Sequence, residues 1–250
     1  MTSLLLKHPF FVGAVVLWLL NESLVGQDDF LSVEDLFEDD DRVAAETIAD
    51  PIEGFNRAMF GFNDYVYKKL LAPVSKGYSA ITPDPLERGF SNFFDNIKYP
   101  VRLTGNILQG KVEGAFQETG KFLVNTTLGV AGFHKASNDF PNLNPPIEDI
   151  GQAFGAWGIG EGFYIVIPFL GPSNARDLVG RLADRIPDVT NTPWTVLDSS
   201  TDRILFWTTD VLTDSPALVY RYESFTQAAI DPYEAMKDGF TKYRIQQIRE

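Results

Sequence analysis

Apolar residues recur at helical spacing along most of this chain, and the first clear case is the segment DPIEGFNRAMFGFNDYVYKKL at residues 50–70. At about 100° per residue, its apolar side chains form two neighbouring stripes that together cover half of the helix surface. One stripe consists of Phe55, Met59, Phe62, Val66 and Leu70, and the second of Phe60, Tyr67 and Leu71. Asp50 can cap this helix, Pro51 suits the first helical position and Glu53 completes a capping box. We therefore expect a helix that begins at Asp50.

Two asparagines interrupt this apolar surface. Asn56 and Asn63 are seven residues apart and point out between the two stripes, whereas the charged side chains of the segment lie opposite. A buried amide needs hydrogen-bond partners. Each asparagine therefore either lines a polar interior or cross-links neighbouring elements, and the sequence leaves both roles open.

The same pattern continues through residues 84–129. Asp84 as a cap and Pro85 begin a helix with one apolar face, formed by Leu86, Phe90, Phe93, Phe94 and Ile97. Two further helices are expected to meet near Gly110, the second ending at a Gly129 C-cap. One side of that second helix carries Val112, Ala115, Phe116, Thr119, Leu123 and Thr126.

The next segments alternate between turns and regular structure. Residues 130–150 are rich in turn formers and predict a loop, and a glycine-rich stretch leads into an extended apolar run over residues 163–170. Helices are expected from a cap at Ser173 to Pro187, and over residues 195–212 and 216–249. The predicted fold class is therefore mainly α, with one short extended segment.

The first 49 residues differ from the rest. An apolar run at residues 10–20 follows Lys7 and His8 and has the length of a signal-peptide core, so residues 1–26 are predicted to be a signal peptide, with an uncleaved anchor as the alternative. Residues 28–50 hold ten acidic residues against one arginine, which favours a flexible acidic leader at 27–49. A partner-docking or membrane-repelling arm is the other interpretation. Residues 50–250 form the predicted folded domain.

The sequence offers little for catalysis. His134 is the one histidine beyond the predicted signal, no G-x-S-x-G or H-E-x-x-H motif occurs, and the chain has no cysteine. The GIGEG stretch lacks the preceding strand and the phosphate-holding lysine of a nucleotide loop. No basic patch with interleaved aromatic residues points to nucleic acid. We therefore expect a protein that is not an enzyme and has no cofactor or metal site.

Five stretches, taken in order, are similar to one family. These are DPIEGFNRAMFGFND, NFFDNIKYPV, NILQGKVEGAFQETGKFLVNTTLGVAGF, EDIGQAFGAWGIGEGFYIVIPFLGPSNARD and DPYEAMKDGF. Their order and spacing resemble the MlaA/VacJ family of outer-membrane lipid-asymmetry proteins over roughly residues 50–245. The resemblance implies a ring of amphipathic helices embedded in the periplasmic leaflet of the outer membrane around a polar channel.

The resemblance also implies a function. Such a protein removes mislocalised phospholipid from the outer leaflet and passes it to a periplasmic carrier of the MlaC type, with trimeric porins as further candidate partners. Typical members carry a lipid-modified cysteine after the signal, and this chain has none. The alternative is a soluble periplasmic lipid-binding or assembly factor with the same fold. A phospholipase would need a nucleophile and a base that the sequence does not offer.

Three sets of residues follow as candidates for that function. The channel lining is predicted to comprise Asn56, Asn63, Asn106, Gln109, Asn125, Gln152, Arg176 and Asp177. Contact with lipid is predicted for Phe55, Met59, Phe62, Phe90, Phe93, Phe94 and Trp157, with an ordinary buried core as the alternative. A gating element that lets an acyl chain leave is predicted around Gly151, Gly155, Gly158, Gly160 and Gly162, with loop 130–150 free to move over one mouth; a structural bend is the alternative.

Overall fold

The computed structural model describes residues 48–190, 195, 197 and 199–250 of the chain. The predicted signal peptide and nearly all of the predicted acidic leader lie outside these residues. The last two residues of that leader are described, and they are part of the folded body. Ile48 is buried in the hydrophobic core, and Ala49 forms a parallel β-bridge with Phe163.

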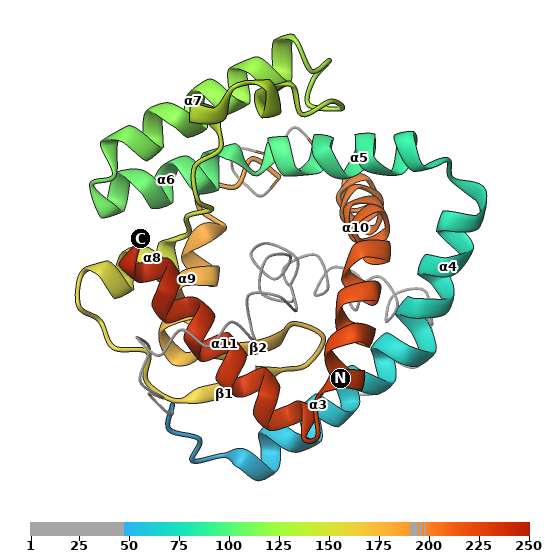
Figure 1. Ribbon diagram of the computed structural model, residues 1–250, viewed down its shortest axis with the longest axis vertical. Helices are drawn as coiled ribbons and strands as arrows, with labels where there is room; N and C mark the ends of the chain where they lie inside the picture. Colours follow the sequence, from blue (N-terminus) through green and yellow to red (C-terminus); the bar gives the residue numbers. More distant parts are fainter. Residues whose placement is uncertain (1–47, 191–194, 196, 198) are drawn as a thin grey trace.

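The described elements are mainly helical and are arranged in a ring (Figure 1). Helices α3, α4, α5, α6 and α7 follow one another around it, and α8, α9 and α11 close the remaining side beside a small hairpin. Their bounds are α3 Glu53–Val66, η1 Tyr67–Leu71, α4 Ala72–Ile81, α5 Asp84–Ile97, α6 Tyr99–Gln109, α7 Val112–Thr127, η2 Ala136–Asp139, η3 Pro141–Leu143, α8 Ile150–Ala156, β1 Tyr164–Ile167, β2 Gly171–Asn174, α9 Ala175–Asp184, α10 Ser200–Ala228 and α11 Pro232–Arg249. The predicted mainly helical fold class is confirmed.

The first helix begins slightly later than predicted, and its cap is different. Helix α3 starts at Glu53 after Ile52, and no side chain caps it. Asp50 was expected to fill this role. Its carboxylate instead accepts hydrogen bonds from Asn56 Nδ2 (2.7 Å) and from the hydroxyl of Tyr233, which lies on α11. Asp50 thus ties the start of the domain to its last helix.

Helices α5, α6 and α7 confirm the predicted turn at Gly110 but not the cap at Gly129. Gly110 ends α6 with φ 72°, in the left-handed region. The chain after α7 reaches that region at Val130 and Ala131 instead. A Cβ on Gly129 would lie 2.0 Å from the carbonyl oxygen of His134, so this glycine is required by a close backbone approach.

The extended apolar segment forms one arm of a hairpin. Strands β1 and β2 are antiparallel, with Tyr164 opposite Asn174 and Ile167 opposite Gly171. Tyr164 is fully buried in the core, which gathers side chains from η1, β1, α10 and α11. The expected cap of α9 at Ser173 is wrong by one residue, because Asn174 accepts from the backbone N–H of Asp177.

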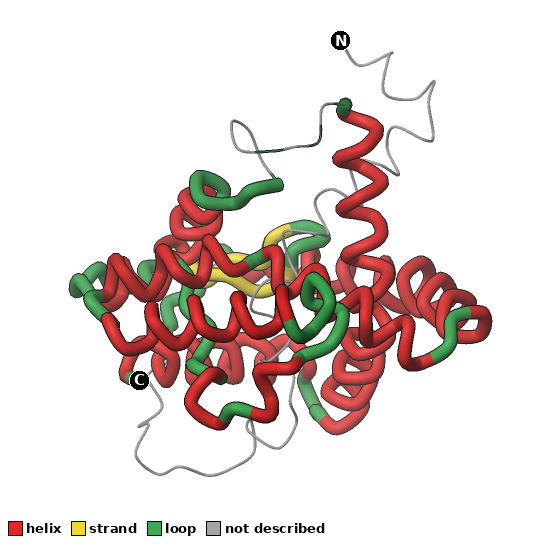
Figure 2. The backbone as a smooth tube through the Cα atoms, turned by 90° about the horizontal axis from the view of Figure 1, so that it is seen from above, coloured by secondary structure: helices red, strands yellow, loops and turns green. Residues whose placement is uncertain are grey.

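One long helix replaces the expected break near residue 213. Helix α10 runs through Pro216 without ending, and the boundary between the last two helices falls at residues 229–231 instead. The first part of α10 stands out from the plane of the ring (Figure 2). Within the described residues, no helix combines the length and the apolar character needed to cross a bilayer.

Candidate functional site

Asn56 and Asn63 fasten the hairpin to α3. Asn56 donates to the carbonyl of Tyr164 (3.0 Å) and accepts from the backbone N–H of Val166 (2.8 Å). Two helical turns later, Asn63 donates to the carbonyl of Ile167 (3.0 Å) and accepts from the backbone N–H of Phe169 (2.7 Å). Both side chains are buried. The spacing of seven residues therefore serves the cross-linking role that the sequence left open.

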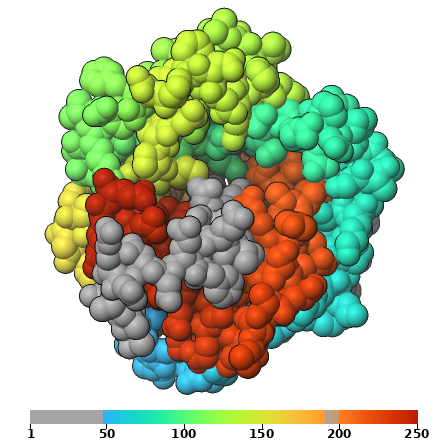
Figure 3. Space-filling model, in the orientation of Figure 1, coloured from blue at the N-terminus to red at the C-terminus, as the bar shows by residue number. Residues whose placement is uncertain are grey.

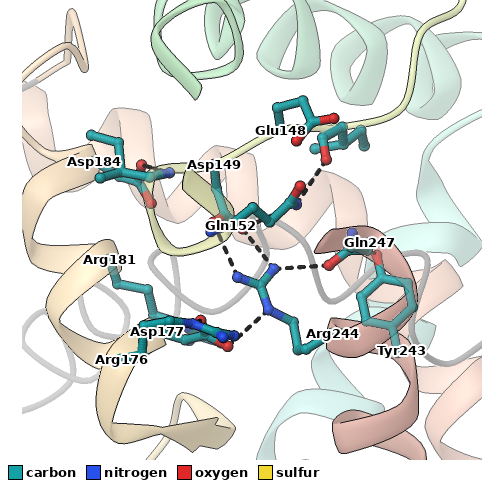
Figure 4. Close-up of polar contacts among 12 residues, drawn as sticks. Glu148, Asp149, Gln152, Arg176, Asp177, Arg181, Asp184, Tyr243, Arg244 and Gln247 are labelled. Carbon is teal, nitrogen blue, oxygen red and sulfur yellow. Dashed lines mark hydrogen bonds and ion pairs between the residues drawn. The ribbon is translucent and has the colours of Figure 1, made fainter. Parts of the chain in front are cut away.

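A second polar cluster joins α8, α9 and α11 (Figure 4). We call it the Arg244 cluster, and it comprises Asp149, Arg176, Asp177, Arg181, Asp184 and Arg244. Arg244 of α11 contacts Asp149 through two nitrogens (2.7 and 3.1 Å) and Asp177 through Nε (2.8 Å). Helices α8 and α9 touch here, since a Cβ on Gly180 would lie 2.4 Å from the Cα of Gly151.

Burial and charge act against each other in this cluster. Burial favours the neutral carboxyl of Asp149 and Asp177, but Arg244 outweighs it and lowers the pKa of both. Asp184 has no comparable partner: burial and the nearby Asp149 raise its pKa to about 8. Its carboxyl group accepts from the backbone N–H of Ile150 at 3.0 Å.

A third polar region lies where α5, α6, α7 and α10 meet. Arg102 pairs with Glu118 (3.1 Å) and Asp95 (3.0 Å), and all three side chains come from different helices. Lys98 lies 3.4 Å from Asp210 and 3.8 Å from Asp214, one turn apart on α10. Burial, opposed by Lys98 and reinforced by Asp214, raises the pKa of Asp210 to about 6.

The other residues predicted to line a channel have identifiable partners. Gln109 donates to Glu148, which also accepts from Lys111 (2.6 Å). Asn125 accepts from the backbone N–H of Ser137 (2.8 Å). Asn106 donates to the carbonyl of Arg102, and Gln152 donates to that of Ile147. Each of these amides is linked to neighbouring backbone or side chains, so the structure by itself does not assign them to a lining.

The residues predicted to touch lipid differ in exposure and fall into three groups. Phe55, Phe62 and Trp157 are exposed. Met59, Phe90 and Phe93 are half-buried. Phe94 is only 5% exposed, and its ring packs edge-on against Phe206 of α10 with centroids 4.9 Å apart. The prediction for Phe94 is therefore wrong, because its position on α5 faces the projecting helix α10.

A further exposed apolar surface was not among the predicted lipid contacts. Phe116 on α7 is 73% exposed, which is unusual for a phenylalanine. It belongs to an apolar set along α6, α7 and the following turn: Ile107, Val112, Phe116, Leu123, Leu128 and Val130. The sequence already placed Val112, Phe116 and Leu123 on one helix face. The sequence did not indicate that α7 lies at the outer side of the ring, with no further helix outside it (Figure 1).

The five candidate gating glycines have different structural roles. Gly151 and Gly155 lie inside α8 at close contacts, and a Cβ on Gly155 would lie 2.5 Å from Ile248. Gly158 and Gly162 adopt positive φ values of 85° and 76°. A Cβ on Gly160 would meet nothing within 4 Å. Helix packing and turn geometry thus explain four of the glycines, and Gly160 has no structural requirement.

The described residues contain no cluster of three or more potential metal ligands. His134 is exposed in the turn-rich segment after α7.

A family model described as MlaA lipoprotein matches residues 48–247. A relative from Escherichia coli (strain K12), the intermembrane phospholipid transport system lipoprotein MlaA, is 28% identical over 77% of this chain and 75% of its own length. The protein of the same name from Haemophilus influenzae is 29% identical over 54% of this chain and 55% of its own length.

A solved structure also resembles this chain. It was described in work on the structural basis for maintenance of bacterial outer membrane lipid asymmetry. The two share 25% sequence identity with a TM-score of 0.66, over 80% of this chain and 99% of the other. The ring of helices is therefore shared with a protein studied for lipid asymmetry.

Proposed function

Because the chain belongs to the MlaA lipoprotein family, we propose that it removes mislocalised phospholipid from the outer leaflet of the bacterial outer membrane. The phospholipid then passes to a soluble periplasmic carrier of the MlaC type. The relatives named for intermembrane phospholipid transport support this class of function. The protein acts by binding and guiding lipid, without a catalytic step.

The observation that carries the proposal is the distribution of apolar side chains. Large exposed apolar residues occur on successive elements around the ring, among them Phe62 on α3, Val74 on α4, Phe116 on α7 and Trp157 after α8. Removing such surface from water is worth about 25 cal/mol per Å². A monomer in water would leave this surface exposed, whereas the acyl chains of one leaflet would cover it.

The position in the membrane follows from the same surface. Amphipathic helices lie in the plane of a leaflet when one face is apolar, and no crossing helix is required. We place the ring in the periplasmic leaflet of the outer membrane. Phe55, Phe62 and Trp157 contact lipid in this arrangement, together with half-buried Phe90 and Phe93. Half-buried Met59 packs against the hydrophobic core. Trimeric porins are candidate partners for the same apolar rim.

The lipid path runs past the polar clusters on the inner elements of the ring. We assign Gln109, Arg176 and Asp177 to its border, with Asn106, Asn125 and Gln152 holding the surrounding elements together. Asn56 and Asn63 support the hairpin. The turn between α8 and β1 gates the path, and Gly160 is its most informative residue because a side chain there meets no neighbour within 4 Å. On the face seen in Figure 3, the coloured elements pack side by side around the rim of the ring.

Gating is tested at Gly160. Replacement of Gly160 by Leu should reduce lipid removal while the protein still accumulates in its membrane, because a bulky side chain there obstructs the path without disturbing packing. Gly155→Leu serves as the contrast, since it clashes with Ile248 and should destabilise the protein. A fully active, correctly located Gly160→Leu variant would show that the turn is only structural.

The membrane assignment is tested by fractionation of native cells. The mature chain should follow the outer membrane and resist a carbonate wash, because its apolar rim is held by acyl chains. Release into the soluble periplasmic fraction would favour the alternative, a soluble lipid-binding or assembly factor. Purified protein gives a second readout: it should need detergent to stay monodisperse.

A further inference from the structure

The two halves of α11 are held to the ring by different kinds of contact. The buried side chains of the first half are mainly apolar and belong to the hydrophobic core: Tyr233, Met236 and Phe240. The buried side chains of the second half are polar: Thr241, Arg244 and Gln247. We call residues 244–249 the α11 bolt, and from it the side chain of Arg244 reaches toward both α8 and α9 (Figure 4).

Arg244 donates hydrogen bonds from the bolt to both α8 and α9. Its guanidinium group donates to Asp149, which caps α8, and to Asp177 in the first turn of α9. Tyr243, just before the bolt, packs against the hydrophobic core, and within the bolt Ile248 packs over Gly155. Unlike hydrophobic burial, which acts over a broad surface, an ion pair depends on a few atoms and can exchange its partner.

Asp149 and Asp177, which accept hydrogen bonds from Arg244, keep other hydrogen-bond donors if the bolt separates from α8 and α9. Asp149 accepts from the backbone N–H of Gln152 at 2.7 Å. Asp177 accepts from Arg176 Nε at 2.9 Å and from Asn174 Nδ2 at 2.8 Å. Removing one partner of a buried ion pair is costly mainly because the other charge is left unpaired. That cost is reduced here, because both carboxylates stay hydrogen-bonded on α8 and α9.

In a second buried ion pair, the carboxylate would not keep a hydrogen-bond donor after its arginine leaves. Arg102 is the hydrogen-bond donor to Oε2 of Glu118, whose other oxygen makes no hydrogen bond. Loss of Arg102 would leave a fully buried carboxylate with only Lys121 at 3.7 Å. Separating α6 from α7 would therefore leave a buried charge without a hydrogen bond, whereas separating the bolt from α8 and α9 would not.

We propose that the α11 bolt detaches from α8 and α9 as a unit, pivoting on the core-anchored first half of α11, and that this opens the ring wall to an acyl chain. The proposal rests on the proposed function, because the opening is useful only if a lipid passes the wall. The residue that controls it is Arg244, which positions the bolt and does not itself contact lipid.

A disulfide can test the movement, because the chain contains no cysteine. A Cβ at position 155 lies 2.9 Å from Cγ1 of Ile248, so Gly155→Cys with Ile248→Cys places two thiols within bonding reach. Cells carrying the oxidised double variant should accumulate phospholipid in the outer leaflet, and reduction should restore normal levels. Gly155→Ser with Ile248→Ser is the matched control, of similar size but unable to cross-link.

A locked protein that keeps the outer leaflet normal would overturn the bolt proposal and leave the proposed function standing. Failure of the unmodified chain to lower outer-leaflet phospholipid would overturn the proposed function instead. The bolt is then judged by the rate at which a polar maleimide modifies Gln247→Cys in the membrane-bound protein, because Gln247 is buried while the bolt is in place. Modification should be more than about tenfold faster than global unfolding, and faster still with Arg244→Gln; a rate equal to unfolding would refute detachment.

Discussion

Asp210→Asn should stabilise the protein at neutral pH. Asp210 is buried, its Oδ1 atom makes no hydrogen bond, and it shares Lys98 with Asp214. Two carboxylates thus face one ammonium group in a buried place. The pKa of Asp210 rises from 3.8 to about 6, because burial and Asp214 outweigh Lys98. At about 1.4 kcal/mol per pH unit, ionising Asp210 in the folded protein costs up to about 3 kcal/mol.

The sign of the effect depends on pH. The folded protein holds this proton more tightly than the unfolded chain, so the contribution to stability is fully present below pH 3.8 and is lost as pH rises to about 6. The asparagine variant never carries the charge. Its advantage over the unmodified protein should therefore be largest at pH 7 and vanish near pH 4.

Thermal unfolding in mild detergent measures this difference. At pH 7 the variant should melt about 6–12 °C higher, at about 2–4 °C per kcal/mol for a chain of this size. Asp202→Asn is the control, because this substitution makes the same chemical change at an exposed position of α10. If the Asp210→Asn variant melts lower than the unmodified protein at pH 7, or if the difference in melting temperature does not change with pH, ionisation of Asp210 does not destabilise the fold.

Three other substitutions probe separate parts of the structure. Asn56→Ala should lower the free energy of unfolding by about 2–5 kcal/mol, because two hairpin backbone groups lose their partner; urea unfolding that gives no loss would contradict the cross-linking role. Gly180→Ala should cost about 1–3 kcal/mol in the same assay, since a Cβ would lie 2.4 Å from Gly151, and an unchanged midpoint would show that α8 and α9 can separate freely. Phe116→Asp should leave thermal stability nearly unchanged but reduce flotation with liposomes, and a loss of stability would instead identify Phe116 as core.

The sequence predicted the helical fold because the apolar periodicity agrees with the positions of the capping residues, prolines and glycines. Gly110 was identified correctly because a short turn between two helices requires the left-handed conformation there. The prediction of a cap at Asp50 was wrong because other partners hold its carboxylate: Asn56 of the same helix, and Tyr233, which lies 183 residues further along the chain and leaves no local signal. The continuity of α10 through Pro216 was missed for a similar reason, since packing holds a helix that local preference would interrupt.

The candidate site was harder to predict than the fold. Periodicity finds an apolar face but does not say whether protein or lipid covers it, and Phe94 and Phe116 show both outcomes. The asparagines of α3 were identified as buried, but their partners lie more than 100 residues away. The Arg244 cluster was found only in part, because Arg244 gave no local signal and meets Asp149 only through the packing of α8, α9 and α11.

The amount of phospholipid in the outer leaflet of intact cells shows whether this protein removes phospholipid from that leaflet. Cells that lack this chain, cells that carry it and cells that carry Gly160→Leu are treated with an amine-reactive probe that does not cross the outer membrane, and the labelled phospholipid is measured. We expect labelling to rise when the chain is absent, to return to the normal level when the chain is restored, and to stay high with Gly160→Leu. Equal labelling with and without the chain would contradict a role in removing phospholipid from that leaflet.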